Sequence, residues 1–219
     1  MTVTEYVDTT QDPPVRGFLH KPASPNGDAL VLTHGAGGNA EMALLVALAD
    51  AFADKGFSIL RCDLPFRQVR RFGPPRPADA KRDQMGLRNA AQAMRKEFPG
   101  KIFLGGQSYG GRQASMLLAD DGSAADGLLL LSYPLHPPNK PDQLRTQHLP
   151  KLYTPTMFVS GTKDPFGTTS EIEAARKLIR AKTELVTIEG VGHDLGVKGK
   201  KGRTDLPGIV CEHFLRFFA

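Results

Sequence analysis

The chain lacks the segments that mark membrane-spanning and secreted proteins. It has no run of about 18 apolar residues, so no membrane-spanning helix is expected. The N-terminal residues Met1–Tyr6 do not join a basic start to an apolar stretch, so no signal peptide is predicted. Only two cysteines occur, Cys62 and Cys211, both in apolar surroundings, and we expect them to be buried free thiols. Together these absences favour a cytoplasmic location and argue against a membrane partner.

Signatures of cofactor and metal sites are missing as well. The glycine-rich segment His34–Gly38 has neither the spacing of a dinucleotide-binding loop nor a Walker-type lysine. No two histidines fall at the spacing of helical metal ligands. We therefore expect no cofactor and no metal. The length of 219 residues, with 40% hydrophobic residues, suits one domain spanning 1–219 and leaves little chain for a separate lid.

Basic residues are present in excess and are clustered. The net charge is +5, and the calculated pI is near 9.3. One cluster lies between Arg61 and Arg88, and a second lies in 198–203. A solvated surface is the favoured interpretation, and an anionic partner is the alternative. Nucleic-acid binding is not expected, because neither aromatic stacking positions nor a helix-turn-helix pattern is visible.

Apolar runs alternate with helical patterns along most of the chain. The runs are continuous rather than alternating, which is typical of strands buried on both faces of a parallel sheet. The predicted strands are 29–33, 57–60, 102–104, 128–131, 156–159 and 185–188. The predicted helices lie around 44–52, 87–98, 111–119, 172–179 and 210–218. The proline-rich segments 65–77 and 133–155 are predicted to be loops, the second with room for a short helix. Residues 3–7 and 15–20 are predicted to form an antiparallel hairpin at the sheet edge. The fold class is therefore α/β, a doubly wound and mostly parallel sheet without a large cap domain.

The most informative motif is Gly106-Gln107-Ser108-Tyr109-Gly110, which falls between a predicted strand and a predicted helix. A serine on such a turn, flanked by glycines, is typical of a nucleophile elbow. Glycine is needed because a Cβ on either side of this sharp turn would clash with neighbouring backbone. The motif predicts that the Ser108 hydroxyl is exposed above the sheet, beside the backbone N–H of Tyr109.

Two further polar residues follow predicted strands, in the order expected of a catalytic triad. Asp164 follows strand 156–159, and His193 follows strand 185–188. Active sites in parallel α/β sheets form at the carboxyl ends of the strands, so Ser108, Asp164 and His193 are predicted to meet there. His193 would act as the base and Asp164 would hold its tautomer. Asp126 and Asp63 stay open as alternative acids.

From Leu30 to Phe218 the sequence resembles the α/β-hydrolases, and among them the small, lidless, dienelactone-hydrolase-like branch. The segment Tyr133–Pro138 shares in this resemblance. One departure is that dienelactone hydrolase carries cysteine at the nucleophile position, where this chain has Ser108. The resemblance therefore implies ester hydrolysis in general, without dienelactone as the substrate.

Further side chains and backbone groups are predicted to contact the substrate. The backbone N–H groups of Ala36 and Tyr109 are the candidate oxyanion donors. The basic segment after strand 57–60 emerges on the same side of the sheet as the site. There Arg67, Arg70 or Arg71 would recognise an anionic group of the substrate. His136, in the proline-rich loop, is a candidate substrate contact, with an ordinary surface histidine as the alternative.

The function predicted from these residues is a serine hydrolase that cleaves esters or thioesters of small acyl groups through an acyl-enzyme intermediate. The substrate is expected to be a small molecule, with an anionic group if the basic loop contacts it. An acyltransferase or a peptidase could use the same three residues. A non-catalytic scaffold that binds an acidic partner is the alternative from another class of protein.

Overall fold

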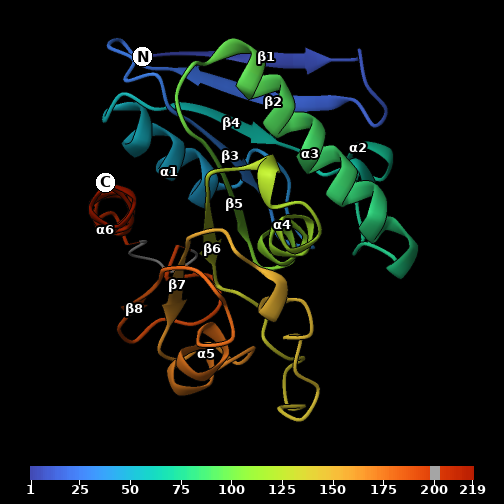
Figure 1. Cartoon of the computed structure of the whole chain (residues 1–219), viewed down its shortest axis with the longest axis vertical. Coiled ribbons are helices and arrows are strands. Elements are labelled where there is room, and N and C mark those ends of the chain that lie inside the picture. Colours follow the sequence, from blue (N-terminus) through green and yellow to red (C-terminus); the bar gives the residue numbers. More distant parts are fainter. Residues whose placement is uncertain (198–202) are drawn as a thin grey trace.

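A single twisted eight-stranded sheet runs through the computed structural model, which describes residues 1–197 and 203–219 (Figure 1). The strand order is β1-β2-β4-β3-β5-β6-β7-β8. The strands are β1 (Thr2–Asp8), β2 (Val15–Lys21), β3 (Ala29–Thr33), β4 (Ser58–Cys62), β5 (Ile102–Gln107), β6 (Gly127–Leu131), β7 (Thr156–Gly161) and β8 (Thr183–Ile188). β1 pairs antiparallel with β2, and β2 pairs antiparallel with β4; the remaining pairs are parallel. This is the mostly parallel sheet with an N-terminal hairpin that the sequence predicts.

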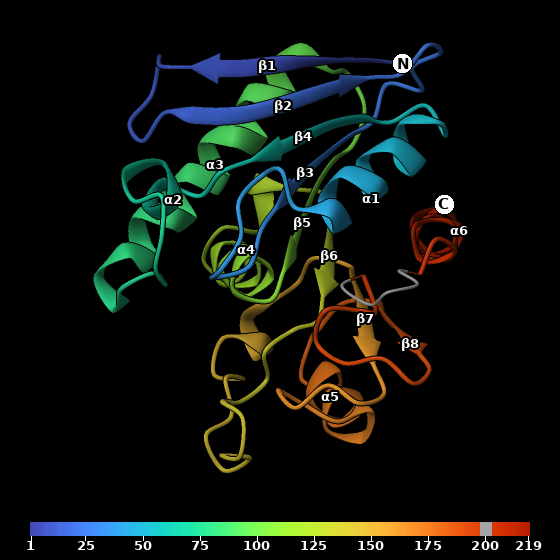
Figure 2. The ribbon, with the colours of Figure 1, turned by 180° about the vertical axis from the view of Figure 1, so that it is seen from behind.

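Helices cover both faces of the sheet, as the continuous apolar strands require. The helices are α1 (Ala43–Ala53), α2 (Pro65–Val69), α3 (Ala80–Glu97), α4 (Tyr109–Asp120), α5 (Thr169–Arg176) and α6 (Leu206–Phe218). α1 and α6 lie on one side, while α3 and α4 lie on the other (Figures 1 and 2). Apolar side chains of α1 and α6 pack in one buried cluster with Leu30 and Leu129 of the sheet. Those of α3, α4 and α5 pack in a second cluster with Val31 and Leu130.

Both cysteines are buried free thiols, as predicted. Burial raises the pKa of the Cys62 thiol to about 12 and that of Cys211 to about 11. None of the described helices is both long and apolar enough to cross a bilayer. Of the second basic cluster, residues 198–202 lie outside the described part of the chain.

Both predicted loops contain helical structure: in 133–155 a 3₁₀ helix occupies Leu149–Lys151, and 65–77 departs further from the prediction. Within 65–77, helix α2 occupies Pro65–Val69, and a 3₁₀ turn begins at Pro77. Pro65 is at the first position of α2, where its fixed φ and missing N–H suit a helix. Phe66 then anchors the helix by burying its ring edge-on against the rings of His34 and Tyr109. Pro65 and Pro77 therefore start helical turns, whereas the sequence interpretation took the prolines of this segment only as breakers.

Candidate active site

Ser108 sits on a strained turn between β5 and α4. Its backbone angles are φ 51° and ψ −114°, outside the regions that non-glycine residues favour. Its N–H donates to the carbonyl of Leu131 at 2.8 Å, which ties the turn to β6. A Cβ at Gly106 would fall 2.5 Å from the backbone nitrogen of Gly111, so this position must be glycine for α4 to start so close to β5. The strain is therefore held in place by the surrounding backbone.

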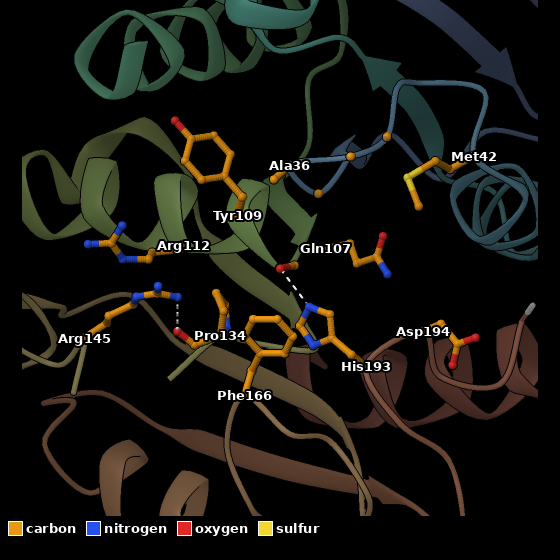
Figure 3. Close-up of a pocket in the computed structure, with 14 residues that line it drawn as sticks. Ala36, Met42, Gln107, Tyr109, Arg112, Pro134, Arg145, Phe166, His193 and Asp194 are labelled. Carbon is orange, nitrogen blue, oxygen red and sulfur yellow. Dashed lines mark hydrogen bonds between the residues drawn. The ribbon is translucent and has the colours of Figure 1, made fainter. Parts of the chain in front are cut away.

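A continuous chain of hydrogen bonds joins Ser108, His193 and Asp164. His193 Nε2 lies 2.8 Å from Ser108 Oγ (Figure 3). On the other side of the ring, Nδ1 lies 2.8 Å from Asp164 Oδ2 and 3.0 Å from Oδ1. A carboxylate can only accept, so Nδ1 carries the proton and the lone pair of Nε2 faces the serine hydroxyl. The structure thus brings together the three residues that the sequence singles out.

Asp164 is held almost wholly out of water behind the histidine. Its side chain is 1% exposed, whereas that of His193 is 24% exposed. The N–H of Phe166 donates to Asp164 Oδ1 at 2.9 Å and fixes the carboxylate. The Phe166 ring packs against the imidazole at an interplanar angle of 31°, with 4.1 Å between ring centroids, and limits how that ring can turn. The two other acids considered are engaged elsewhere: Asp63 accepts from Ala40 N–H, and Asp126 pairs with Arg95.

The loop after β3 passes over Ser108 and carries Ala36 into the same site. His34 fixes the start of this loop: its Nδ1 lies 2.8 Å from the Gly35 carbonyl, and its Nε2 accepts from the N–H of Leu64 at 3.1 Å. Burial, with the nearby charge of Arg67, lowers the pKa of His34 to about 4, so the ring is neutral at pH 7. In the described residues the N–H groups of Ala36 and Tyr109 have no internal acceptor. Both residues line the cavity in front of Ser108.

The Tyr109 side chain points away from the cavity and is fixed by a buried carboxylate. Its hydroxyl donates to Asp83 Oδ2 at 2.7 Å, while the N–H of Phe66 donates to Asp83 Oδ1 at 3.0 Å. Burial raises the pKa of Asp83, and the two hydrogen bonds act in the opposite direction. Asp83 thereby connects helix α3 to the first residues of both α2 and α4, which steadies the backbone beside Ser108.

The four residues suggested as substrate contacts do not line the cavity. Arg67 is buried, and its guanidinium donates to five backbone carbonyls, those of Gly38, Arg70, Arg71, Ala36 and Gly73. Arg70 pairs with Asp79, and the Arg71 guanidinium lies over the Phe72 ring. His136 is buried between the Pro137 carbonyl and Glu171. The basic loop follows β4 as expected, and the contacts of its arginines named here are with other groups of the protein.

Two arginines that the sequence interpretation missed line the cavity instead. The cavity has a volume of about 670 Å³, and Ser108, Arg112, Arg145 and His193 are among its lining residues (Figure 3). Arg112 comes four residues after Ser108, a spacing that places two residues on the same face of a helix. That spacing was a usable signal in the sequence. Arg145 belongs to the long segment between β6 and β7, where no periodicity indicates which side chains turn inward.

Comparison with known proteins agrees with this architecture. Residues 26–211 match the family model of the alpha/beta hydrolase domain. An alpha-beta serine hydrolase homologue from Coxiella burnetii superposes with a TM-score of 0.76 at 18% identity, over 97% of this chain and 98% of that one. A dienelactone hydrolase from Anabaena variabilis gives 0.74 at 18% identity, over 98% of each chain. XC6422 from Xanthomonas campestris, a serine hydrolase without a lid, gives 0.70 at 15% identity, over 98% of this chain and 94% of that one. These solved structures share the fold of this chain, and the family match agrees with the resemblance to the α/β-hydrolases seen in the sequence.

Proposed function

Because this chain belongs to the alpha/beta hydrolase family, we propose that it is a serine hydrolase acting on esters or thioesters of small acyl groups. The observation that carries the proposal is the unbroken series of hydrogen bonds from Asp164 through His193 to Ser108, which opens onto the cavity. A serine hydroxyl is a poor nucleophile unless a neighbouring base removes its proton, and this arrangement supplies one. We further propose that residues 1–219 form a single domain of this fold.

The reaction would proceed through an acyl-enzyme. Ser108 Oγ attacks the carbonyl carbon while its proton passes to His193 Nε2. The tetrahedral intermediate collapses, the bond to the alcohol oxygen or thiol sulfur breaks, and His193 returns the proton to that leaving group. A water molecule then attacks the acyl group and gives its proton to His193. Ser108 Oγ takes the proton back as the carboxylic acid leaves. Asp164 stabilises the imidazolium that exists in both halves of the cycle.

The oxyanion of each tetrahedral intermediate would be bound by backbone N–H groups. Those of Ala36 and Tyr109 are the proposed donors, since both residues line the cavity and neither N–H is used within the described residues. A donor of this kind contributes about 3–4 kcal/mol to the transition state in comparable sites. The Ala36 N–H can stabilise the oxyanion only if the loop that carries it is rigid. The hydrogen bonds of Arg67 and His34 to the backbone of this loop therefore support catalysis.

The test is hydrolysis of 4-nitrophenyl acetate and 4-nitrophenyl butyrate by the parent protein and by Ser108→Ala. Folding of the variant is checked by circular dichroism, and a fluorophosphonate probe is applied to both proteins. We expect turnover and labelling in the parent, and neither in the variant. Equal turnover by both proteins would place the reaction elsewhere. Absence of both turnover and labelling in a folded parent would reject the serine-hydrolase function.

A further inference from the structure

Arg112 lines the cavity from the first turn of α4, the helix that follows Ser108. Its backbone N–H donates to the Ser108 carbonyl at 2.9 Å, so the two residues are one helical turn apart, a rise of about 5.4 Å. The side chain is half-buried, and its Nε is buried without a hydrogen-bond partner among the described residues. A buried donor without an acceptor is costly and is usually explained by a missing partner.

Arg145 reaches the same part of the cavity from the segment between β6 and β7. Its backbone carbonyl accepts from the Tyr133 hydroxyl at 2.7 Å, and its Nη1 donates to the Pro134 carbonyl at 3.1 Å. Figure 3 shows its guanidinium facing that of Arg112. Burial and the charge of Arg112 both lower the pKa of Arg145, as expected when two cations are brought together out of water.

No carboxylate of the described residues pairs with either arginine, whereas seven other arginines of this chain have one. Ion pairs do form at Arg70, Arg82, Arg88, Arg95, Arg176, Arg203 and Arg216. Asp194 is the carboxylate at the cavity wall, but it lies beyond His193, on the side away from the two arginines (Figure 3). His148 adds no positive charge, because burial and the charge of Arg112 lower its pKa to about 4. Among the described residues, the cations of the cavity therefore lie at one end.

We propose that Arg112 and Arg145 bind a carboxylate of the substrate, so that the preferred substrates are esters or thioesters of small dicarboxylic acids. The proposal rests on the serine-hydrolase function above and specifies its substrate class. Two planar guanidinium groups can hold one carboxylate through several charge-assisted hydrogen bonds. A cavity of about 670 Å³ that holds both this carboxylate and the scissile carbonyl fits a short acyl chain.

The kinetic test uses two esters of equal acyl length, 4-nitrophenyl hydrogen adipate and 4-nitrophenyl hexanoate, with uncatalysed rates subtracted. We expect the parent to favour the acidic ester. Arg112→Gln and Arg145→Gln should each lower its kcat/KM about 10- to 100-fold, the range expected on losing a hydrogen bond to a charged group, with little change for the neutral ester. Arg112→Lys keeps the charge and should restore part of the preference.

The matched control is Arg71→Gln, which removes an exposed arginine outside the cavity and should leave both rates unchanged. No preference in the parent, an equal loss on both esters in the Gln variants, or a loss of preference in Arg71→Gln would each overturn the proposal. Thermal melting identifies any variant that fails to fold. If Arg112→Gln fails, the preference of Arg112→Lys for the acidic ester decides whether position 112 contributes to binding.

A binding measurement separates this inference from the proposed function. Ser108→Ala protein is titrated with monomethyl adipate and with methyl hexanoate by calorimetry, alone and combined with Arg112→Gln. Binding of the acidic ester that Arg112→Gln abolishes supports the arginine pair even if no ester is turned over. Equal binding of the two esters, or no effect of Arg112→Gln, rejects the pair even if Ser108 proves to be the nucleophile.

Discussion

Lowering the pH from 7 to 5 should destabilise this protein through His34, which lies at the start of the loop over Ser108. The ring is fully buried, donates from Nδ1 to the Gly35 carbonyl and accepts at Nε2 from the N–H of Leu64. Protonation would turn Nε2 into a donor that faces the N–H donor of Leu64, and both groups are buried. Asp63 Oδ1, 3.6 Å from Nε2, is too far for a hydrogen bond that would compensate.

The sign and size of the effect follow from the two pKa values. In the unfolded chain the pKa of His34 is about 6.5, whereas in the folded protein burial lowers it to about 4. The stability from His34 is therefore complete above pH 6.5 and is lost as the pH falls toward 4. A difference of about 2.5 units corresponds to roughly 3 kcal/mol in total, of which about 2 kcal/mol is lost between pH 7 and pH 5.

The assay is urea unfolding of the parent and of His34→Gln at pH 7 and pH 5. The free energy of unfolding of the parent should fall by about 2 kcal/mol more between these pH values than that of the variant. Comparing the two pH slopes cancels the other histidines and any fixed cost of the substitution. His148→Gln should reduce the pH dependence in the same direction, because burial also lowers the pKa of His148 to about 4, and it tests the same reasoning outside this loop. Parallel slopes for the parent and His34→Gln would refute the reasoning.

Two further substitutions test how the site is held. Asp164→Asn should lower kcat about ten-thousand-fold with KM little changed, because an amide can no longer hold the His193 tautomer. Steady-state kinetics on 4-nitrophenyl butyrate measures this change. A loss of kcat below tenfold would remove Asp164 from the mechanism. Arg67→Met should lower the free energy of unfolding by about 3 kcal/mol and reduce turnover of neutral esters too, because Arg67 donates to the Ala36 carbonyl and four others. Unchanged melting and kinetics would show that these hydrogen bonds do not support the loop.

Much of the fold was predictable because each buried strand is a continuous apolar run. The strand predicted at 29–33 is found at Ala29–Thr33, and the antiparallel hairpin is also confirmed. Helix α5 was displaced: the apolar periodicity indicated 172–179, but the helix spans Thr169–Arg176. Its start is set by a capping box between Thr168 and Glu171, a polar signal that a search for apolar faces passes over.

The positions of Ser108, Asp164 and His193 could be predicted because sheet topology determines them. In a parallel sheet every strand ends at the same edge, so a polar residue after an apolar run is brought to a common place whatever the details of packing. The partners of Arg67 could not be predicted in this way. Its acceptors are backbone carbonyls, which every residue carries, and only the folded path of the loop decides which of them converge on one guanidinium.

The hydrogen-bond acceptors around an arginine of this chain decide whether it stabilises the fold or can bind a substrate. Arg67 was a reasonable candidate for anion binding from its place after a strand, yet five carbonyls occupy its donors. Arg112, in an ordinary helical pattern, has a buried Nε with no acceptor among the described residues. A buried guanidinium with satisfied donors stabilises the fold, whereas one with unsatisfied donors beside a second cation is stabilised by an incoming anion. The residue type is the same in both cases, so the distinction between scaffold and substrate contact lies in the hydrogen-bond partners that the fold supplies.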